Sequence, residues 1–265
     1  MKTKLFCLTI AFAVAGLCNS AAFAFDPMGP PTAGQRGLGR AGIGVEYVWS
    51  EMDIEAEGIS SLDILTDTVE NFKVGKTYAN LGLGTSDGSE IFLRVGVGEA
   101  DPDRGGNAEN IGGYLGKSDE CFLLGGGAKF TLCKNENISW GLLTQMSWTE
   151  FDFDQRTSTI NGHSATLSTD AEFIEVQIAV GPTLEIGDAL SVYGGPFLHF
   201  VGGKLELDGT IDGSDSEVTS DLEQESILGG YVGLQLDLSK NMDMSVELQG
   251  TGAGYALGAS LRYKY

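Results

Sequence analysis

The stretch YALGASLRYKY, residues 255–265, decides the fold. Every other residue in it is apolar or aromatic, and the residues between them are small or charged. Period-two alternation predicts a β-strand with one oily face and one polar face. Either a second layer of polypeptide or a lipid bilayer must cover the oily face, and the rest of the sequence distinguishes between these two possibilities.

The same alternation recurs along the chain, so we predict ten strands, with eight as the alternative count. The other segments are residues 41–49, 76–84, 90–98, 120–133, 138–148, 173–186, 190–203, 227–238 and 242–250. The segment 190–203 contains Pro196, which predicts a bulge or an irregular strand at that point.

The connections between these segments alternate between long and short. The long ones are residues 51–70, 99–120, 150–172 and 206–225, whereas the short ones are tight turns such as TSDGSE and KNEN. One end of the structure would then carry short periplasmic turns and the other long external loops, which is typical of an outer-membrane barrel. We therefore predict an all-β fold, a transmembrane antiparallel up-and-down β-barrel over residues 39–265.

A soluble β-sandwich is the alternative fold for an alternating pattern. Two observations favour the barrel. Glycine, serine, glutamine and scattered charges lie opposite the oily faces, which suits a narrow wet lumen. Trp140 and Trp148 share one oily face and lie about 26 Å apart along a strand, close to the spacing of two aromatic girdles. The girdle residues that we predict are Tyr47, Trp49, Trp140, Trp148, Tyr263 and Tyr265.

With these residues in view, the chain resembles the bacterial outer-membrane β-barrel family. The specific motif is the terminal strand ending aromatic-x-aromatic, Tyr263 and Tyr265. The resemblance implies a place in the bacterial outer membrane, contact with its lipid, and recognition of the last strand by the barrel-insertion machinery. Ser260 stands where the family often has glycine, a small-for-small difference.

The first residues have the features of a secretory signal peptide. Lys2 and Lys4 precede a short apolar run, and Ala22 to Ala24 fits a small-x-small cleavage site, so we predict a signal peptide over residues 1–24. A lipoprotein signal centred on Cys18 is the alternative. We expect residues 25–38 to form a flexible segment that leads into the first strand.

Cys121 and Cys133 lie at the two ends of one predicted strand, too far apart for an intramolecular disulfide. We expect two small buried thiols.

The formal net charge is −21, which argues against nucleic-acid binding. Acidic residues are concentrated in the four long connections, so we expect the external mouth to attract cations, an attraction that salt would weaken. Asp212, Asp215 and Glu217 are candidate ligands for Ca²⁺ or another divalent cation, although the spacing of an EF-hand is absent. The sequence predicts no other cofactor and identifies no external ligand.

Residues on the polar faces are predicted to point into the lumen. They are Glu46, Lys76, Arg94, Lys129, Glu175, His199, Asp237, Glu247 and Arg262. Since a barrel of this size leaves little room inside, we expect a mostly filled interior or at most a narrow, cation-leaning conduit. Within the first long connection, residues 60–72 have apolar residues at helical spacing, which predicts either a short helix or an irregular loop.

Only His163 and His199 are available as bases at neutral pH. Neither belongs to a recognisable catalytic motif, and the residue pairs of barrel deacylases and omptin-like proteases have no match in this sequence. We therefore expect a structural or surface-interaction protein rather than an enzyme. A small passive channel is the alternative, and a barrel hydrolase is the further one.

Overall fold

The computed structural model describes residues 28–34, 37, 39–55, 66–102, 118–160, 163–211, 213–223, 227–252 and 254–265, so the expected signal peptide lies outside the described part. Among the described residues, no helix is long and apolar enough to cross a membrane. The strands are β1 Gly39–Glu55, β2 Thr66–Ser86, β3 Ser89–Pro102, β4 Ser118–Lys134, β5 Ile138–Ile160, β6 His163–Ile186, β7 Leu190–Ile211, β8 Ser214–Glu223, β9 Leu228–Ser239, β10 Met242–Thr251 and β11 Gly254–Lys264.

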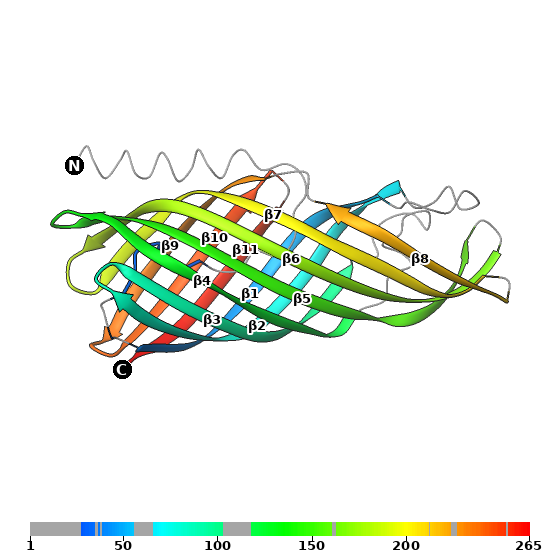
Figure 1. Ribbon diagram of the computed structural model, residues 1–265, viewed down its shortest axis with the longest axis horizontal. Helices are drawn as coiled ribbons and strands as arrows, with labels where there is room; N and C mark the ends of the chain where they lie inside the picture. Colours follow the sequence, from blue (N-terminus) through cyan, green and yellow to red (C-terminus); the bar gives the residue numbers. More distant parts are fainter. Residues whose placement is uncertain are drawn as a thin grey trace.

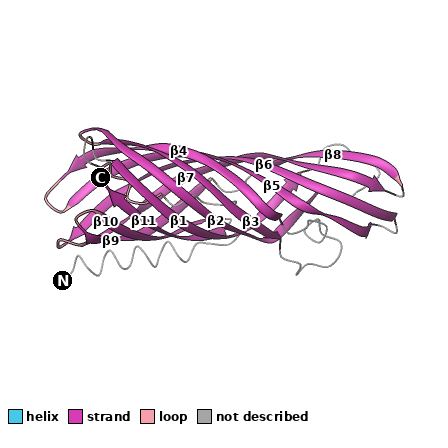
Figure 2. Ribbon diagram, turned by 90° about the horizontal axis from the view of Figure 1, so that it is seen from below, coloured by secondary structure: helices cyan, strands magenta, loops and turns pink. Residues whose placement is uncertain are grey.

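The sheet closes on itself (Figures 1 and 2). The last strand, β11, pairs antiparallel with β1 from Arg40 opposite Lys264 to Ser50 opposite Gly254. All other neighbours in the ring are antiparallel too, and ten strands, β1–β7 and β9–β11, complete it. The predicted ten-stranded barrel is confirmed, and a two-layered sandwich is excluded.

Strand β8 stands outside this ring of ten. It pairs with the far half of β7, from Gly202 to Ile211, while β9 takes the near half of β7, from Leu190 to Leu198. The other edge of β8 pairs with the end of β1, residues 53–55. Figure 1 shows that β5, β6, β7 and β8 extend well beyond β9, β10 and β11 at the same end of the barrel. Beyond those short strands, β8 therefore joins β7 directly to β1.

Four turns, which join β2 to β3, β4 to β5, β6 to β7 and β9 to β10, lie at the opposite end, where the last residue also lies. Gly88 and Gly187 sit in two of these turns with φ of +94° and +70°, a backbone conformation that glycine adopts without strain. Gly39 and Tyr265 exchange two backbone hydrogen bonds of 3.0 Å at this end. We call it the short-turn end.

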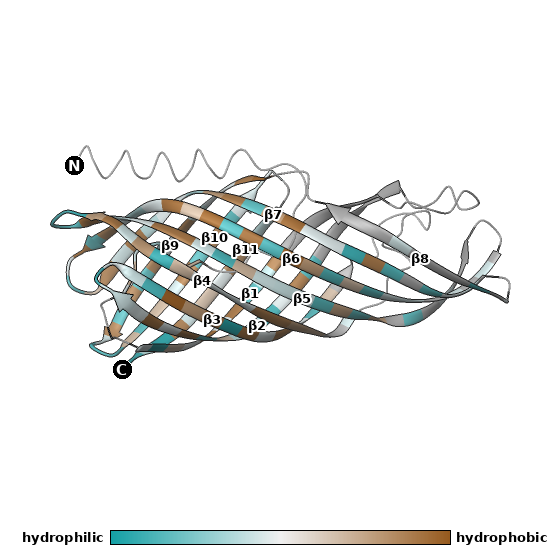
Figure 3. Cartoon of the chain, in the orientation of Figure 1, coloured by the Kyte–Doolittle hydropathy of each residue, from teal (hydrophilic) through white to brown (hydrophobic). Residues whose placement is uncertain are grey.

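A belt of exposed apolar side chains surrounds the ring of ten strands. It includes Ile43, Val45, Leu81, Leu93, Val95, Leu124, Met146, Ile178, Leu234, Val246 and Leu257. Figure 3 shows the brown and teal bands that result from alternation along each strand. Exposed apolar surface on this scale is unfavourable in water, and an apolar band around a closed barrel is the surface that lipid covers.

The two faces of the wall exchange character beyond this belt. On β5 the inward residues Gln145 and Thr149 are followed by Phe151 and Phe153, which are all buried. The outward residues change in the opposite sense, from exposed Met146 to exposed Glu150 and Asp152. A sheet with an apolar inner face and a charged outer face is suited to water on its outside.

The extended parts of β5–β8 form what we call the projecting sheet, residues 149–160, 163–173 and 201–223. Its inner face is a small apolar core in which the Phe151 ring lies 6.1 Å from that of Phe153 and 5.6 Å from that of Phe173, measured between ring centroids. Leu205 of β7 is buried in the same cluster. Burying each such side chain contributes about 1.5–3 kcal/mol, so the sheet has its own source of stability outside the membrane.

Three sequence expectations are wrong in this region. Residues 150–172 and 206–225 were expected to be long external loops, but β5, β6, β7 and β8 occupy most of both ranges. The charges that suggested loops lie on the outer faces of strands. The possible helix over residues 60–72 is also incorrect for residues 66–72, which belong to β2.

Two glycines make room for aromatic rings inside the barrel. A Cβ atom on Gly44 would lie 2.3 Å from the Tyr78 ring, and one on Gly233 would lie 2.2 Å from the Tyr193 ring. Any larger residue would displace these rings, so the glycines on the inner wall allow a narrow barrel to enclose large side chains.

Candidate functional site

The interior of the ring holds most of the residues predicted to face the lumen. Glu46, Lys76, Arg94, Lys129, Glu175, His199 and Glu247 are all nearly fully buried. The remaining two, Arg262 and Asp237, are partly exposed near the short-turn end. There the Nε atom of Arg262 donates to Asp243 at 2.7 Å, and Lys264 Nζ donates to Asp237 at 2.8 Å.

Charged side chains and glutamines fill the middle of the barrel. Glu175 lies between two partners: its Oε1 is 3.4 Å from Lys76 Nζ, and its Oε2 is 3.3 Å from His199 Nε2. Gln177 accepts a hydrogen bond from Gln145 and donates one to a third glutamine on β10. Buried polar groups need such partners, and together these side chains occupy the cross-section.

The chain before β1 lies inside the barrel rather than outside it. We call residues 28–34 the inner segment. The backbone N–H groups of Met28 and Gly29 each donate to the Glu247 carboxylate at 2.8 Å. From the other side, Lys129 Nζ donates to the carbonyl oxygens of Met28 at 2.7 Å and Pro30 at 2.9 Å.

The far end of the inner segment is held in the same manner. The N–H of Ala33 donates to Thr131 Oγ1 at 3.1 Å, and the N–H of Gly34 donates to Glu90 Oε2 at 2.7 Å. These contacts use backbone groups of the segment, so its side chains carry no signal for them. For this reason the sequence predicts only a flexible segment over residues 25–38, although residues 28–34 lie within the barrel.

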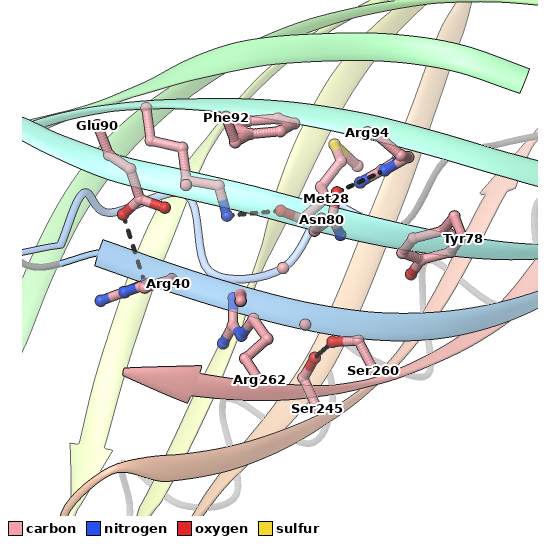
Figure 4. A pocket seen from close by; sticks show the side chains of 15 residues that line it. Met28, Arg40, Tyr78, Asn80, Glu90, Phe92, Arg94, Ser245, Ser260 and Arg262 are labelled. Atoms are coloured by element: carbon pink, nitrogen blue, oxygen red, sulfur yellow. Dashed lines mark hydrogen bonds and ion pairs between the residues drawn. The ribbon is translucent and has the colours of Figure 1, made fainter. Parts of the chain in front are cut away.

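A cavity of about 40 Å³ lies beside the inner segment (Figure 4). Four cationic side chains line it, from Arg40, Arg94, Lys129 and Arg262, together with the single carboxylate of Glu90. They come from β1, β3, β4 and β11, and the segment itself contributes Met28 and Gly29. Glu90 and Asp243 were not among the predicted lumen residues, although their position in the alternation places both on the polar faces.

The outer face of the projecting sheet carries rows of acids. The strand register places Asp152 of β5 opposite Asp170 of β6, and Asp170 opposite Glu206 of β7. In the next row, Glu150 lies opposite Glu172, and Glu172 lies opposite Lys204 of β7, so this row ends in a cation. Side chains directly opposite one another on antiparallel strands are close neighbours, so like charges there repel.

This repulsion changes the proton affinity of the central acid. Partial burial, followed by the carboxylates of Asp152, Asp208 and Glu206, raises the pKa of Asp170 above its ordinary value. The rows are therefore a fixed concentration of negative charge, held by paired strands rather than by loops.

The predicted girdle residues lie on the outer wall where their side chains are described. Tyr47, Trp140, Tyr263 and Tyr265 are exposed. The half-buried Trp148 has its indole N–H directed at Glu172, and its ring contacts that of Phe122 edge-on. The side chain of Trp49 is outside the described part. Tyr255, at the other end of β11 from Tyr265, is also exposed and was not in the predicted set.

The predicted cation ligands fall mainly outside the described part. Asp212 and the side chain of Glu217 are not described, and Asp215 is exposed. The described residues contain no group of three or more acids, histidines or cysteines arranged to hold a metal ion. Neither Cys121 nor Cys133 forms a disulfide among the described residues. Cys121 is buried, whereas Cys133 is exposed, contrary to the expectation of two buried thiols, because a register shift beside it interrupts the alternation.

The two histidines occupy different environments. His199 is fully buried next to Glu175, and its ring packs edge-on against Phe197 with centroids 6.4 Å apart. His163 begins β6 at the tip of the projecting sheet, and its side chain is not described. The structure thus places the two histidines at separate levels of the barrel.

The fold is that of the bacterial outer-membrane β-barrel proteins. The outer membrane protease OmpT from Escherichia coli is similar, with a TM-score of 0.51 and 12% identity over 91% of this chain and 99% of that chain. Also similar are the translocator domain of the autotransporter NalP from Neisseria meningitidis (TM-score 0.48, 13% identity, 86% and 88% covered) and OprG from Pseudomonas aeruginosa (0.43, 11%, 87% and 97%). No family model and no curated protein matches the sequence.

Proposed function

We propose that this protein is a closed barrel of a bacterial outer membrane that displays a rigid acidic sheet outside the membrane and interacts with cations or cationic partners through it. The observation that carries the proposal is the set of acidic rows on the outer face of β5–β7. Because the inner face of the same strands is an apolar core, the acids are held in fixed positions.

The filled interior supports a surface role over a transport role. The Lys76–Glu175–His199 contacts occupy the middle of the barrel, and the inner segment occupies the part nearer the short-turn end. A passive channel needs a continuous wet path, and these contacts would have to break to provide one.

The proposed role includes no catalytic step. His199 is enclosed among interior side chains and already bound to Glu175, so it is poorly placed to meet an external substrate. The proposed cations include divalent ions, which oxygen-rich surfaces attract through long-range electrostatics even without a preformed site.

The test is binding of a fluorescent tetralysine peptide to the full protein in nanodiscs of neutral lipid. One variant removes three acids from the projecting sheet: Asp152→Asn, Asp170→Asn and Glu206→Gln. We expect its affinity for the peptide to fall several-fold, and the salt dependence of binding to become weaker.

The matched control removes three exposed acids from the short-turn end: Asp87→Asn, Glu136→Gln and Asp188→Asn. It has the same net charge as the first variant, and we expect peptide binding close to that of the natural protein. Equal losses in both variants, or no loss in either, would show that the projecting sheet has no special role.

A further inference from the structure

We propose that the cavity beside the inner segment is a binding site for a small inorganic anion of halide size, formed jointly by the barrel wall and the inner segment. The rows of acid on the outside make such a site unexpected. Three features of the cavity support this site: the charge of its lining, the donors with spare hydrogen-bonding capacity, and its size.

The lining has a marked excess of positive charge. Five lining side chains carry a formal charge: Arg40, Arg94, Lys129 and Arg262 are basic, and only Glu90 is acidic. Glu90 is already engaged, because its Oε2 accepts the Gly34 N–H at 2.7 Å and lies 3.4 Å from Arg40 Nη1. An excess of one sign in a buried space is costly unless an ion of the opposite sign compensates it.

Two further carboxylates act on this group from outside the cavity. Asp243 is bound by Arg262 and Lys264, at 2.7 Å and 3.1 Å, and does not line the cavity. Glu247 is turned to the backbone N–H groups of the inner segment and does not line it either. The basic side chains that face the cavity are therefore only partly neutralised by these two carboxylates.

Several donors around the cavity have capacity to spare. Lys129 uses two of its three N–H bonds on carbonyl oxygens of the inner segment, and none of the described residues accepts the third. The Nε atom of Arg40 is buried and has no hydrogen-bond partner within the described part. Ser245 and Ser260 share one hydrogen bond of 2.7 Å, which leaves one hydroxyl proton for another acceptor.

The cations converge on one point of the inner segment. A Cβ atom on Gly29 would lie 3.2 Å from Lys129 Nζ and 3.4 Å from Arg262 Nη1, so both charges lie beside this glycine. Figure 4 shows the Arg262 and Arg94 side chains entering the same space from opposite strands. Arg94 is oriented by its contacts with Asn80 at 3.1 Å and with the Tyr78 ring at 4.6 Å.

The cavity is large enough for a small anion. A volume of about 40 Å³ has room for roughly three water molecules, and a single-atom anion fits in it without displacing protein. Charge-assisted hydrogen bonds from Lys129 and the arginines would hold such an ion. Because Met28 and Gly29 form one wall, the site exists only while the inner segment is in place, so anion binding stabilises that placement.

The test uses bromide as the probe and the full protein in detergent micelles. Unfolding temperature is measured as sodium bromide replaces sodium gluconate at constant ionic strength, since gluconate is too large to enter. A ligand that binds only the folded state raises this temperature in a saturable manner. We expect that behaviour for the natural protein, together with an anomalous bromide peak inside the cavity in crystals.

Two variants and a control decide the outcome. Lys129→Gln and Arg94→Gln should each weaken bromide binding about tenfold or more. Lys134→Gln removes an exposed cation at the short-turn end, which pairs with Glu185, and should leave binding unchanged. If Lys129→Gln fails to fold, Arg94→Gln and the position of the bromide peak decide. An equal bromide effect in all variants, no saturation, or a peak only elsewhere would overturn the proposal.

Discussion

The inner segment gives the sharpest quantitative prediction, through the substitution Glu247→Gln. The Glu247 carboxylate accepts the N–H groups of Met28 and Gly29, each at 2.8 Å. Hydrogen bonds to a charged acceptor contribute about 1.5–3 kcal/mol each. A glutamine keeps one acceptor oxygen but turns its own NH₂ toward the second donor, so about one such bond is lost.

We therefore expect the free energy of releasing the inner segment to fall by about 2 kcal/mol, which corresponds to a rise of roughly thirtyfold in the released population. Native-state hydrogen exchange of the peptide covering residues 28–34, read by mass spectrometry, measures this population directly. Exchange of that peptide should quicken by the same factor, and exchange in the rest of the barrel should not.

The matched control is Glu185→Gln, which removes an exposed carboxylate at the short-turn end that lies 3.3 Å from Lys134 Nζ. Its inner segment should exchange at the natural rate. Unchanged exchange in Glu247→Gln, or the same increase in the control, would refute the reasoning that this carboxylate holds the segment.

Three further predictions concern the projecting sheet and the interior. The raised pKa of Asp170 means that the folded state binds this proton more tightly than the unfolded state does. The free energy of unfolding should therefore rise as pH falls through that pKa. Asp170→Asn should remove this dependence, and urea unfolding should show a stabilisation of about 0.2–1 kcal/mol at neutral pH. A loss of stability in that variant would contradict the repulsion. Phe173→Ala should cost about 3–5 kcal/mol, and Ile174→Ala on the lipid side distinctly less; the reverse order, measured in the same unfolding experiment, would mean that the inner face is not a packed core. Deleting residues 25–34 should leave planar bilayers without conductance steps, because the contacts of Lys76 and His199 with Glu175 still close the middle of the barrel; steps in this variant would show that the inner segment is the main closure.

Much of the ring of ten strands follows from alternation alone. In β11 and in the belt part of β5, the apolar residues that the pattern assigns to one face are exposed or half-buried on the outer wall, whereas the polar residues assigned to the other face are buried or partly buried. The alternation also predicts that Lys76, Glu175 and His199 face the interior, where all three are buried. The reason is physical: in a closed barrel each strand has only two faces, so one periodicity determines both environments.

The sequence does not reveal the projecting sheet because the alternation continues there with the faces exchanged: the apolar residues point inward and the polar residues point outward. Phe151, Phe153 and Phe173 alternate with Glu150, Asp152 and Glu172, but the acids were taken as evidence of loops. A search for alternation irrespective of which face is oily would have found these strands. The inner segment is different, because its backbone is hydrogen-bonded to side chains far away in the sequence, and no local pattern reveals such contacts. Strand β8 forms an antiparallel hairpin with the end of β7, but its polar and acidic residues are equally typical of a loop.

The central claim is that the barrel wall has its apolar face on the outside within the membrane and on the inside where the strands project beyond the membrane. A cysteine scan along β5 tests this claim most directly. In a background in which Cys121 and Cys133 are replaced by serine, a spin label is placed at successive positions from Trp140 to Phe153 and its access to lipid-soluble and water-soluble relaxing agents is measured. The account predicts lipid contact at even-numbered positions up to Trp148, water contact at Glu150 and Asp152, and shielding from both agents at the odd-numbered positions. Lipid contact at positions 150 and 152, or water access at 151 and 153, would contradict it.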